Sequence, residues 1–287
     1  MDAAKAMAIM RMNEAPLHQY MGYHKIKNAG LPLIAIPTTA GTGSEATKVA
    51  VITDTERNVK MMIFDAHLMP TVALVDYELS LSMPPSLTAH VGVDTLTHGM
   101  EAYVSRKANA LSDPLALTCI DLVARHLYTA WLEPANRVAR EGMALAACVG
   151  GMSFTNSSVC LVHGMSRPLG VQFHLPHGLS NAVLLPAVTR FSVSGAPDRY
   201  ATIARTMALA QIGTSDEAAC EALLMGLERQ NQALKIPRLQ DCPGVEKAVF
   251  EQSIEKMASD ALASGSPQNN PIVPNADEIV ALYRQAW

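Results

Sequence analysis

The chain has 287 residues, of which 49% are hydrophobic, so it is long enough to bury the cores of two domains. Its net charge of −4 and isoelectric point near 6.1 argue against nucleic acid or an anionic membrane surface as the main partner, because a mildly acidic surface attracts neither. No apolar run of about eighteen residues predicts a membrane span and the start lacks the order of a signal peptide, so we expect a cytoplasmic protein without a membrane partner.

The cysteine content is typical of a reduced protein. The five cysteines are odd in number, far apart and mostly set in apolar helical stretches (Cys119, Cys148, Cys160, Cys220 and Cys242). This pattern predicts buried thiols rather than a disulfide framework. A catalytic cysteine is the minor alternative.

Helix and strand signals alternate in the first part of the chain. Residues 2–11 are rich in alanine and methionine and predict a helix that begins almost at the first residue. Residues 31–38 (LPLIAIPT) form a branched apolar run typical of a buried strand, and residues 39–45 (TAGTGSE) predict a glycine-rich loop after it. The small side chains of this loop would let a ligand approach the backbone, but an ordinary turn explains the same pattern.

Three more strands are predicted at residues 48–53, 59–64 and 71–75, with a hairpin-like reversal at TDTERN between the first two. After Met83-Pro84-Pro85 every periodic segment is helical. We therefore expect two domains, an α/β domain at residues 1–83 and an all-α domain at residues 84–287.

The second domain carries clear helix signals. Ser112-Asp113-Pro114 supplies a capping residue and a proline in the first turn, which favours the start of a helix. Apolar spacing of three and four residues predicts further helices. These lie at residues 137–152, 197–211, 215–230, 245–263 and 275–286.

Two stretches of the helical domain contain potential metal ligands. Asp94 and His98 are four residues apart, so on a helix both side chains project from one face. His163 and His177 are separated by Pro168, Gly170 and Pro176, which are expected to break a straight helix. We therefore expect His163 to end one helix and His177 to begin the next.

One carboxylate and three neutral imidazoles suit a divalent first-row metal ion and leave a position open for a substrate oxygen. The alternative is that each histidine is an ordinary surface or core residue. Glu101 lies on the same predicted helix as Asp94 and His98, where it either orients a metal ligand or forms a salt bridge elsewhere.

At these residues the chain resembles the iron-containing (group III) alcohol dehydrogenases, the family of lactaldehyde reductase, 1,3-propanediol dehydrogenase and butanol dehydrogenases. The segments GVDTLTHGMEAY and HGMSRPLG to PHGLSN resemble its two signatures, and the similarity extends from residue 2 to Trp287. The resemblance implies that Asp94, His98, His163 and His177 bind the metal. The ion would be Fe(II), or Zn(II) or another divalent first-row metal.

The resemblance also implies a site for NAD or NADP. The segment PTTAGTGSE resembles the family's cofactor-contacting loop and assigns Thr38, Thr39 and Thr42 to the cofactor. Lys60 matches a lysine beside the nicotinamide ribose, although a solvated strand lysine is the alternative. Asp2 matches the family's D-x-x-K, but the glycine-rich turn that precedes it in the family is absent. We therefore expect the remnant of a dinucleotide-binding domain, which keeps its metal but binds nicotinamide cofactor weakly.

Arg167 departs from the family pattern, because many members carry histidine at this position. An arginine cannot readily shuttle a proton, but it can bind a carboxylate or phosphonate through two hydrogen bonds. We therefore expect a preference for anionic substrates, with His174 taking over the proton relay. The alternatives are that Arg167 pairs with a cofactor phosphate or with a structural acid.

The activity implied by the resemblance is reversible hydride transfer between NAD(P)(H) and a small alcohol or aldehyde, with the metal polarising the substrate oxygen. We expect the enzyme to be a homodimer. Two other classes stay open, a metal-dependent lyase resembling dehydroquinate synthase and an inactive fragment that serves as a binding module.

Overall fold

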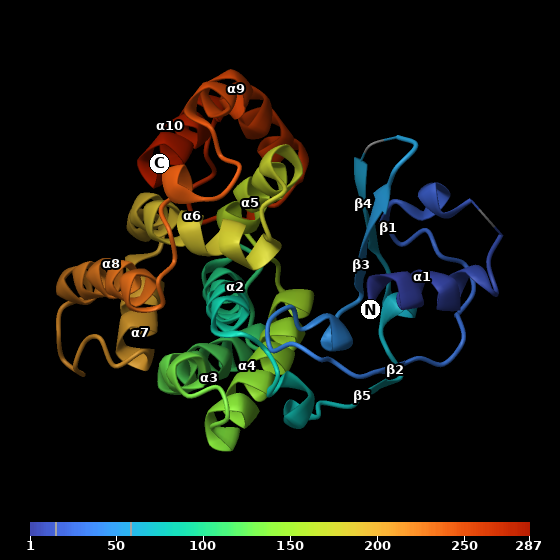
Figure 1. The fold of residues 1–287 in the computed structure, drawn as a ribbon, viewed down its shortest axis with the longest axis horizontal. Coiled ribbons are helices and arrows are strands. Elements are labelled where there is room, and N and C mark those ends of the chain that lie inside the picture. The colour runs from blue at the N-terminus through green and yellow to red at the C-terminus, as the bar shows by residue number, and fades with distance from the viewer. Residues whose placement is uncertain (15, 58) are drawn as a thin grey trace.

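The computed structural model describes residues 1–14, 16–57 and 59–287, and shows a small α/β part followed by a larger helical part (Figure 1). In the α/β part, α1 (Asp2–Met10) lies beside a three-stranded sheet in the order β1-β4-β3. Strands β3 (Val49–Asp54) and β4 (Val59–Phe64) are antiparallel, and β1 (Gly22–Tyr23) pairs parallel to β4. The predicted hairpin is confirmed, although Asn58 of its turn lies outside the described residues.

The prediction of a buried strand at residues 31–38 is wrong in both length and burial. Only Ile34–Ala35 (β2) forms a strand, paired parallel to Val72–Ala73 (β5), which is itself shorter than predicted. Ile34 is 63% exposed. The described residues add no third strand to this pair, and an apolar sequence becomes buried only where another element covers it.

The helical part begins where the strands end, and its helices confirm the predicted segments with small shifts of their bounds. They are α2 (Pro85–Val104), α3 (Ser112–Leu132), α4 (Arg137–Asn156), α5 (Leu161–Phe173), α6 (His177–Ser192), α7 (Pro197–Thr206), α8 (Asp216–Ala233), α9 (Lys247–Ala263) and α10 (Ala276–Ala286). Helix α7 ends before the predicted residue 211, because Ala208 has a φ of 56°, which a right-handed helix cannot contain.

Helix α2 lies at the centre of the helical part, and α3, α4 and α6 pack around it (Figure 1). One continuous apolar core includes buried side chains from every helix between α2 and α10. Pro85 in the first turn of α2 favours the start of this helix, since its fixed φ suits a helix and no hydrogen-bond donor is needed there. The core therefore holds α2 rigidly on several sides.

The chain bends by 107° between α4 and α5. Among the described residues no single helix is both long and apolar enough to cross a membrane, and α4 with α5 reaches that length and composition only as this bent pair. The five cysteines are all free and buried, as predicted.

The expected helix break after His163 is wrong. Helix α5 begins at Leu161 and runs through Pro168 and Gly170 to Phe173, so His163 lies in its first turn. Pro168 lacks only the donor that would reach the carbonyl of Gly164, and the other hydrogen bonds of the helix remain. The expectation that His177 begins the next helix is confirmed.

Candidate metal centre

Helix α2 supplies the first two potential ligands. Asp94 and His98 are one turn apart on α2, with only 1% and 4% of their surface exposed. The distance from the His98 Nε2 to the Asp94 Oδ1 is 3.8 Å. The predicted shared face of the helix is therefore directed into the interior.

Helix α5 supplies His163, and Glu101 fixes its orientation. The His163 Nδ1 lies 2.6 Å from the Glu101 carboxylate, which also accepts hydrogen bonds from the backbone N–H groups of Cys160 and Val162. Glu101 thus ties the first turn of α5 to α2 and leaves the His163 Nε2 directed at the centre. This contact is the one that the ligand-orienting alternative for Glu101 requires, whereas no salt bridge elsewhere engages Glu101 among the described residues.

Helix α6 supplies His177 as its first residue. The close approach of α6 to α2 requires glycine at position 178, since a Cβ atom there would lie 2.6 Å from the carbonyl oxygen of His90. The His177 Nε2 lies 3.8 Å from the Asp94 Oδ1, and the His177 side chain is 44% exposed. His177 therefore forms the open side of the group.

Three of the four side chains, Asp94, His98 and His163, are close enough together to hold a divalent metal ion. A tetrahedral site with metal–ligand bonds of about 2.1 Å places its ligand atoms about 3.4 Å apart. The His163 Nε2 lies 3.0 Å from the His98 Nε2 and 3.5 Å from the Asp94 Oδ1. Asp94, His98 and His163 offer atoms that all lie within 4.8 Å of one another. The donor set, nitrogen with one hard oxygen, suits iron or zinc.

Burial and neighbouring charges shift the pKa values of this group. Burial lowers the pKa values of His98 and His177 to about 4 against the opposing effect of Asp94, so both imidazoles are neutral near pH 7. Burial acts in the same direction on His163, but Glu101 and Asp94 outweigh it and raise its pKa to about 9. Burial opposes ionisation of Asp94, yet the three imidazoles hold its pKa below the ordinary value.

Asn181 was missed by the sequence interpretation. Its side-chain Nδ2 lies 2.6 Å from the Asp94 Oδ1 and 3.2 Å from the Nε2 atoms of both His163 and His177. Asn181 is one helical turn after His177 on α6, so the spacing in PHGLSN was the available signal.

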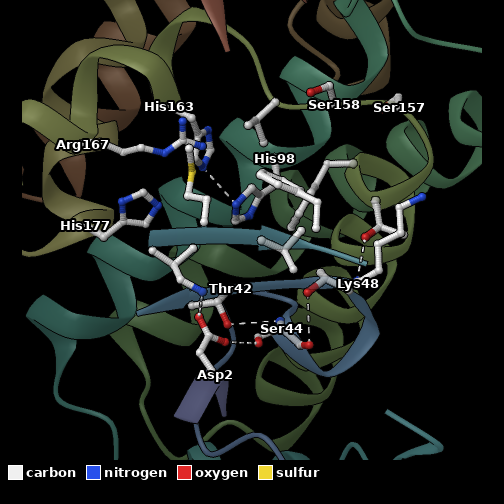
Figure 2. A pocket seen from close by; sticks show the side chains of 18 of the residues that line it. Asp2, Thr42, Ser44, Lys48, His98, Ser157, Ser158, His163, Arg167 and His177 are labelled. Carbon is white, nitrogen blue, oxygen red and sulfur yellow. Dashed lines mark hydrogen bonds between the residues drawn. The ribbon is translucent and has the colours of Figure 1, made fainter. Parts of the chain in front are cut away.

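A cavity of about 470 Å³ lies between the α/β part and the helical part. Figure 2 shows His163, Arg167 and His177 at one end of it, Ser157 and Ser158 at the other, and Asp2, Thr42 and Ser44 across the strands. Asp94 and His98 also line it. The ring of Phe154 stacks on His98, with centroids 4.5 Å apart, and covers one side of the group.

The structure brings some of the predicted cofactor residues to this cavity and leaves others outside it. Asp2, Thr42 and Lys60 line the cavity, whereas Thr38 and Thr39 do not. The Asp2 carboxylate accepts hydrogen bonds from the Ser44 hydroxyl and the Val51 backbone N–H, both 2.9 Å long. Asp2 therefore joins α1, the glycine-rich loop and β3.

The two predicted catalytic residues lie in different surroundings. Arg167 is one turn after His163 on α5, lines the cavity and donates a 2.8 Å hydrogen bond to the Ser266 hydroxyl. Burial lowers the pKa of its guanidinium from the ordinary value. His174 ends α5 with a φ of 54° and is exposed outside the cavity lining.

Comparisons with known proteins agree with this geometry. The family model for the iron-containing alcohol dehydrogenases matches residues 1–77, and the model for the C-terminal part of that family matches residues 88–287. The chain is 38% identical to the 1,3-propanediol dehydrogenase of Klebsiella pneumoniae over 286 residues, which are 100% of this chain and 73% of that protein. It is 36% identical to the NAD-dependent methanol dehydrogenase of Bacillus methanolicus, over 99% of this chain and 74% of that protein.

A solved structure gives the same result. The structure of a 1,3-propanediol oxidoreductase matches 100% of this chain and 74% of its own, with a TM-score of 0.96 and 38% identity. The chain spans about three quarters of the length of these relatives. It belongs to the iron-containing alcohol dehydrogenase family and is an oxidoreductase.

Proposed function

We propose that this chain transfers a hydride between NAD(P)(H) and a small alcohol or aldehyde, and that Asp94, His98, His163 and His177 hold the metal. The observation that carries the proposal is the convergence of these four side chains, from three helices, on the wall of one cavity. A bound divalent metal would act as a Lewis acid toward the substrate oxygen.

The protein's own residues prepare this site. Glu101 holds the proton-bearing Nδ1 of His163, so the opposite ring nitrogen faces the centre. The low pKa values of His98 and His177 keep their ring nitrogens free of a second proton near pH 7, whereas the raised pKa of His163 means that a metal would have to displace the second proton from its Nε2 on binding. Phe154 excludes water from the face of His98, which strengthens electrostatic interactions at the site.

We also propose that residues 1–83 belong to a dinucleotide-binding domain and that the helical domain begins at residue 84. Asp2, Thr42 and Lys60 support this proposal, because they line the same cavity as the four potential ligands. The roles of Thr38, Thr39 and His174 remain predictions. Titration with NADH and with NADPH will show which of the two cofactors the chain binds.

The central experiment is metal analysis together with NADH- or NADPH-linked reduction of short aldehydes. The purified chain should contain about one divalent metal, and His163→Ala or His177→Ala should lower metal content and turnover together. His126→Ala is a matched control, because His126 lies on α3 and packs on Gly142 away from the cavity. Equal metal content in all variants would exclude these ligands.

The same experiment separates the alternative functions. A lyase would consume substrate without net oxidation of the reduced cofactor, and a binding module would hold metal without turnover. The family relationship supports neither alternative over hydride transfer.

Arg167 is the residue that we propose to select anionic substrates. Its guanidinium lies in the cavity wall on the same face of α5 as His163, and Ser266 anchors one of its nitrogens at 2.8 Å. Among the described residues no carboxylate lies within salt-bridge distance of it, and Glu101, which is near enough to oppose the lowering of its pKa by burial, is paired with His163. A half-buried, planar cation with free donors suits a carboxylate or phosphonate group.

The test of Arg167 compares an acid semialdehyde with a neutral aldehyde of the same length. The kcat/KM for the acid should exceed that for the neutral substrate, and Arg167→Ala should remove the difference. Lys107→Ala is the control, since Lys107 lines the same cavity but is exposed. Loss of cofactor affinity with unchanged substrate preference would instead assign Arg167 to a cofactor phosphate.

The cytoplasmic location and the homodimer are proposals as well. The free, buried cysteines support a reducing compartment. Light scattering of the purified chain measures the oligomeric state, and a mass of one chain would contradict the dimer.

A further inference from the structure

Asn181 lies beside the potential metal ligands and has no assigned part in the site. It is completely buried on α6, four residues after His177. Its amide Nδ2 approaches three of the four ligand atoms, at 2.6 Å from the Asp94 Oδ1 and at 3.2 Å from the Nε2 atoms of His163 and His177. These contacts place the amide at the edge of the metal centre itself.

The chemistry of the neighbours determines what this amide can do. When the imidazole lone pairs are directed at a metal they cannot accept a hydrogen bond, so the Asp94 carboxylate is the acceptor that remains for the Asn181 N–H. The distance of 2.6 Å agrees with a strong hydrogen bond to a charged acceptor. Apart from the imidazoles, no other described side chain hydrogen bonds to Asp94.

We propose that Asn181 is a positioning residue that holds the Asp94 carboxylate toward the metal, an inference that rests on the proposed metal function. Because Asn181 and His177 share one face of α6, the hydrogen bond from Asn181 to Asp94 fixes the α6 ligand relative to the α2 ligands. Asn181 therefore controls metal affinity through Asp94.

In the alternative arrangement the Asn181 amide is turned, so that its oxygen and not its nitrogen faces the metal. The Asn181 Oδ1 is buried and lacks a hydrogen-bond partner, and the two ends of an amide are nearly indistinguishable in shape. If the amide were turned, its oxygen would face the metal as a ligand. Replacing the amide with a carboxylate distinguishes the two arrangements, because it removes a donor but adds a stronger ligand.

The experiment measures the affinity of the purified chain for Co(II) by competition with a chromogenic chelator. The wild type should bind one Co(II), and His163→Ala should abolish binding, which tests the proposed metal site by itself. Asn181→Ala should weaken binding by about 10- to 100-fold, the effect typical of residues that orient a ligand. Asn181→Asp should weaken it at least as much, since two carboxylates would then face each other at the 2.6 Å contact.

Asn270→Ala is the matched control. Asn270 is a buried asparagine of the helical part that hydrogen bonds to Ser192 and Ile272, outside the cavity, so its loss tests general destabilisation. The proposal is supported if both Asn181 variants lose at least about tenfold in affinity while Asn270→Ala binds like the wild type. A smaller loss in either Asn181 variant overturns it, and tighter binding by Asn181→Asp would assign the amide as a ligand. Asn181→Asp keeps the volume of the side chain, so the test holds even if Asn181→Ala does not fold.

Discussion

The two parts of the molecule are stabilised in different ways. The helical part has one apolar core that extends from α2 to α10. The α/β part has a small separate cluster formed by Ile9, Ile26, Ala50, Ile63 and Leu68. The buried side chains proposed as metal ligands lie on helices of the first core, so their geometry depends on the packing of helices and not on the sheets.

Polar contacts supplement the small core of the α/β part. Lys5 is 1% exposed, and its ammonium group donates to the Thr47 carbonyl, the Thr47 hydroxyl and the Val49 carbonyl at 2.8 to 3.0 Å. These bonds join α1 to β3. The short strands β2 and β5 carry exposed apolar side chains, with Ile34 63% and Val72 45% exposed. The α/β part is therefore expected to open before the helical part does.

Two glycines form a close backbone contact between the parts. A Cβ atom at Gly151 on α4 would lie 2.4 Å from the carbonyl oxygen of Gly43, and Gly43 itself has a φ of 60°. The glycine-rich loop thus touches the α4 backbone directly. A side chain at either position would collide with this backbone contact.

The largest expected effect comes from Glu101. Glu101→Ala removes the acceptor of the Cys160 and Val162 N–H groups and of His163, which leaves buried donors unpaired. We expect the free energy of unfolding to fall by about 3–5 kcal/mol, the range for breaking a buried ion pair. Urea unfolding measures it. Glu101→Gln keeps a hydrogen-bond acceptor, so its free energy of unfolding should fall less than that of Glu101→Ala. Equal decreases in the two variants would contradict the role of the hydrogen bonds.

The second prediction compares the two cores directly. Leu96→Ala in α2 and Ile63→Ala in β4 each remove a side chain that is at most 1% exposed. Each substitution should therefore lower the free energy of unfolding of its own part by about 2–5 kcal/mol. Hydrogen exchange should show that Ile63→Ala opens β3 and β4 while α2 stays protected. Leu96→Ala should instead lower protection throughout the helices. Identical exchange maps would show that the parts unfold as one unit.

The third prediction concerns the contact between the parts. Gly151→Ala should destabilise the protein by about 1–3 kcal/mol, because the added methyl group forces the loop at Gly43 away from α4. Thermal unfolding measures the loss. Leu145→Ala on the same helix is a control, since that side chain is 49% exposed. A Gly151 variant as stable as this control would show that the contact is not tight in solution.

The smallest expected effect is a pH dependence from Lys5. Burial lowers the pKa of Lys5 to about 8, although Asp2 and Glu45 oppose the shift. Between pH 8 and the unfolded pKa of about 10.4, the unfolded chain binds more protons, so stability from this residue rises with pH by up to about 1.4 kcal/mol per unit. Below pH 8 the contribution is constant. The difference in unfolding free energy between wild type and Lys5→Met, measured from pH 7 to 9.5, should show this slope, and a flat difference would contradict it.

Several features of the site were predictable because they are local. The four-residue spacing of Asp94 and His98 places both side chains on one helix face whatever surrounds the helix. The start of α6 at His177 was equally readable from Pro176, and the helices after residue 84 followed from apolar spacing. The signature segments were sufficient to indicate the family.

The tertiary structure decided which of these residues meet. His163 comes within 3.0 Å of His98 because Glu101 holds the first turn of α5 against α2, a contact between residues 62 positions apart. The approach of α6 through Gly178 brings Asn181 to Asp94 across 87 positions. The exposure of Ile34 could likewise not be predicted from the apolar run in which it lies. Sequence periodicity fixes the direction of a side chain within its own element, whereas convergence and burial depend on which elements pack against it, and only the folded chain determines that.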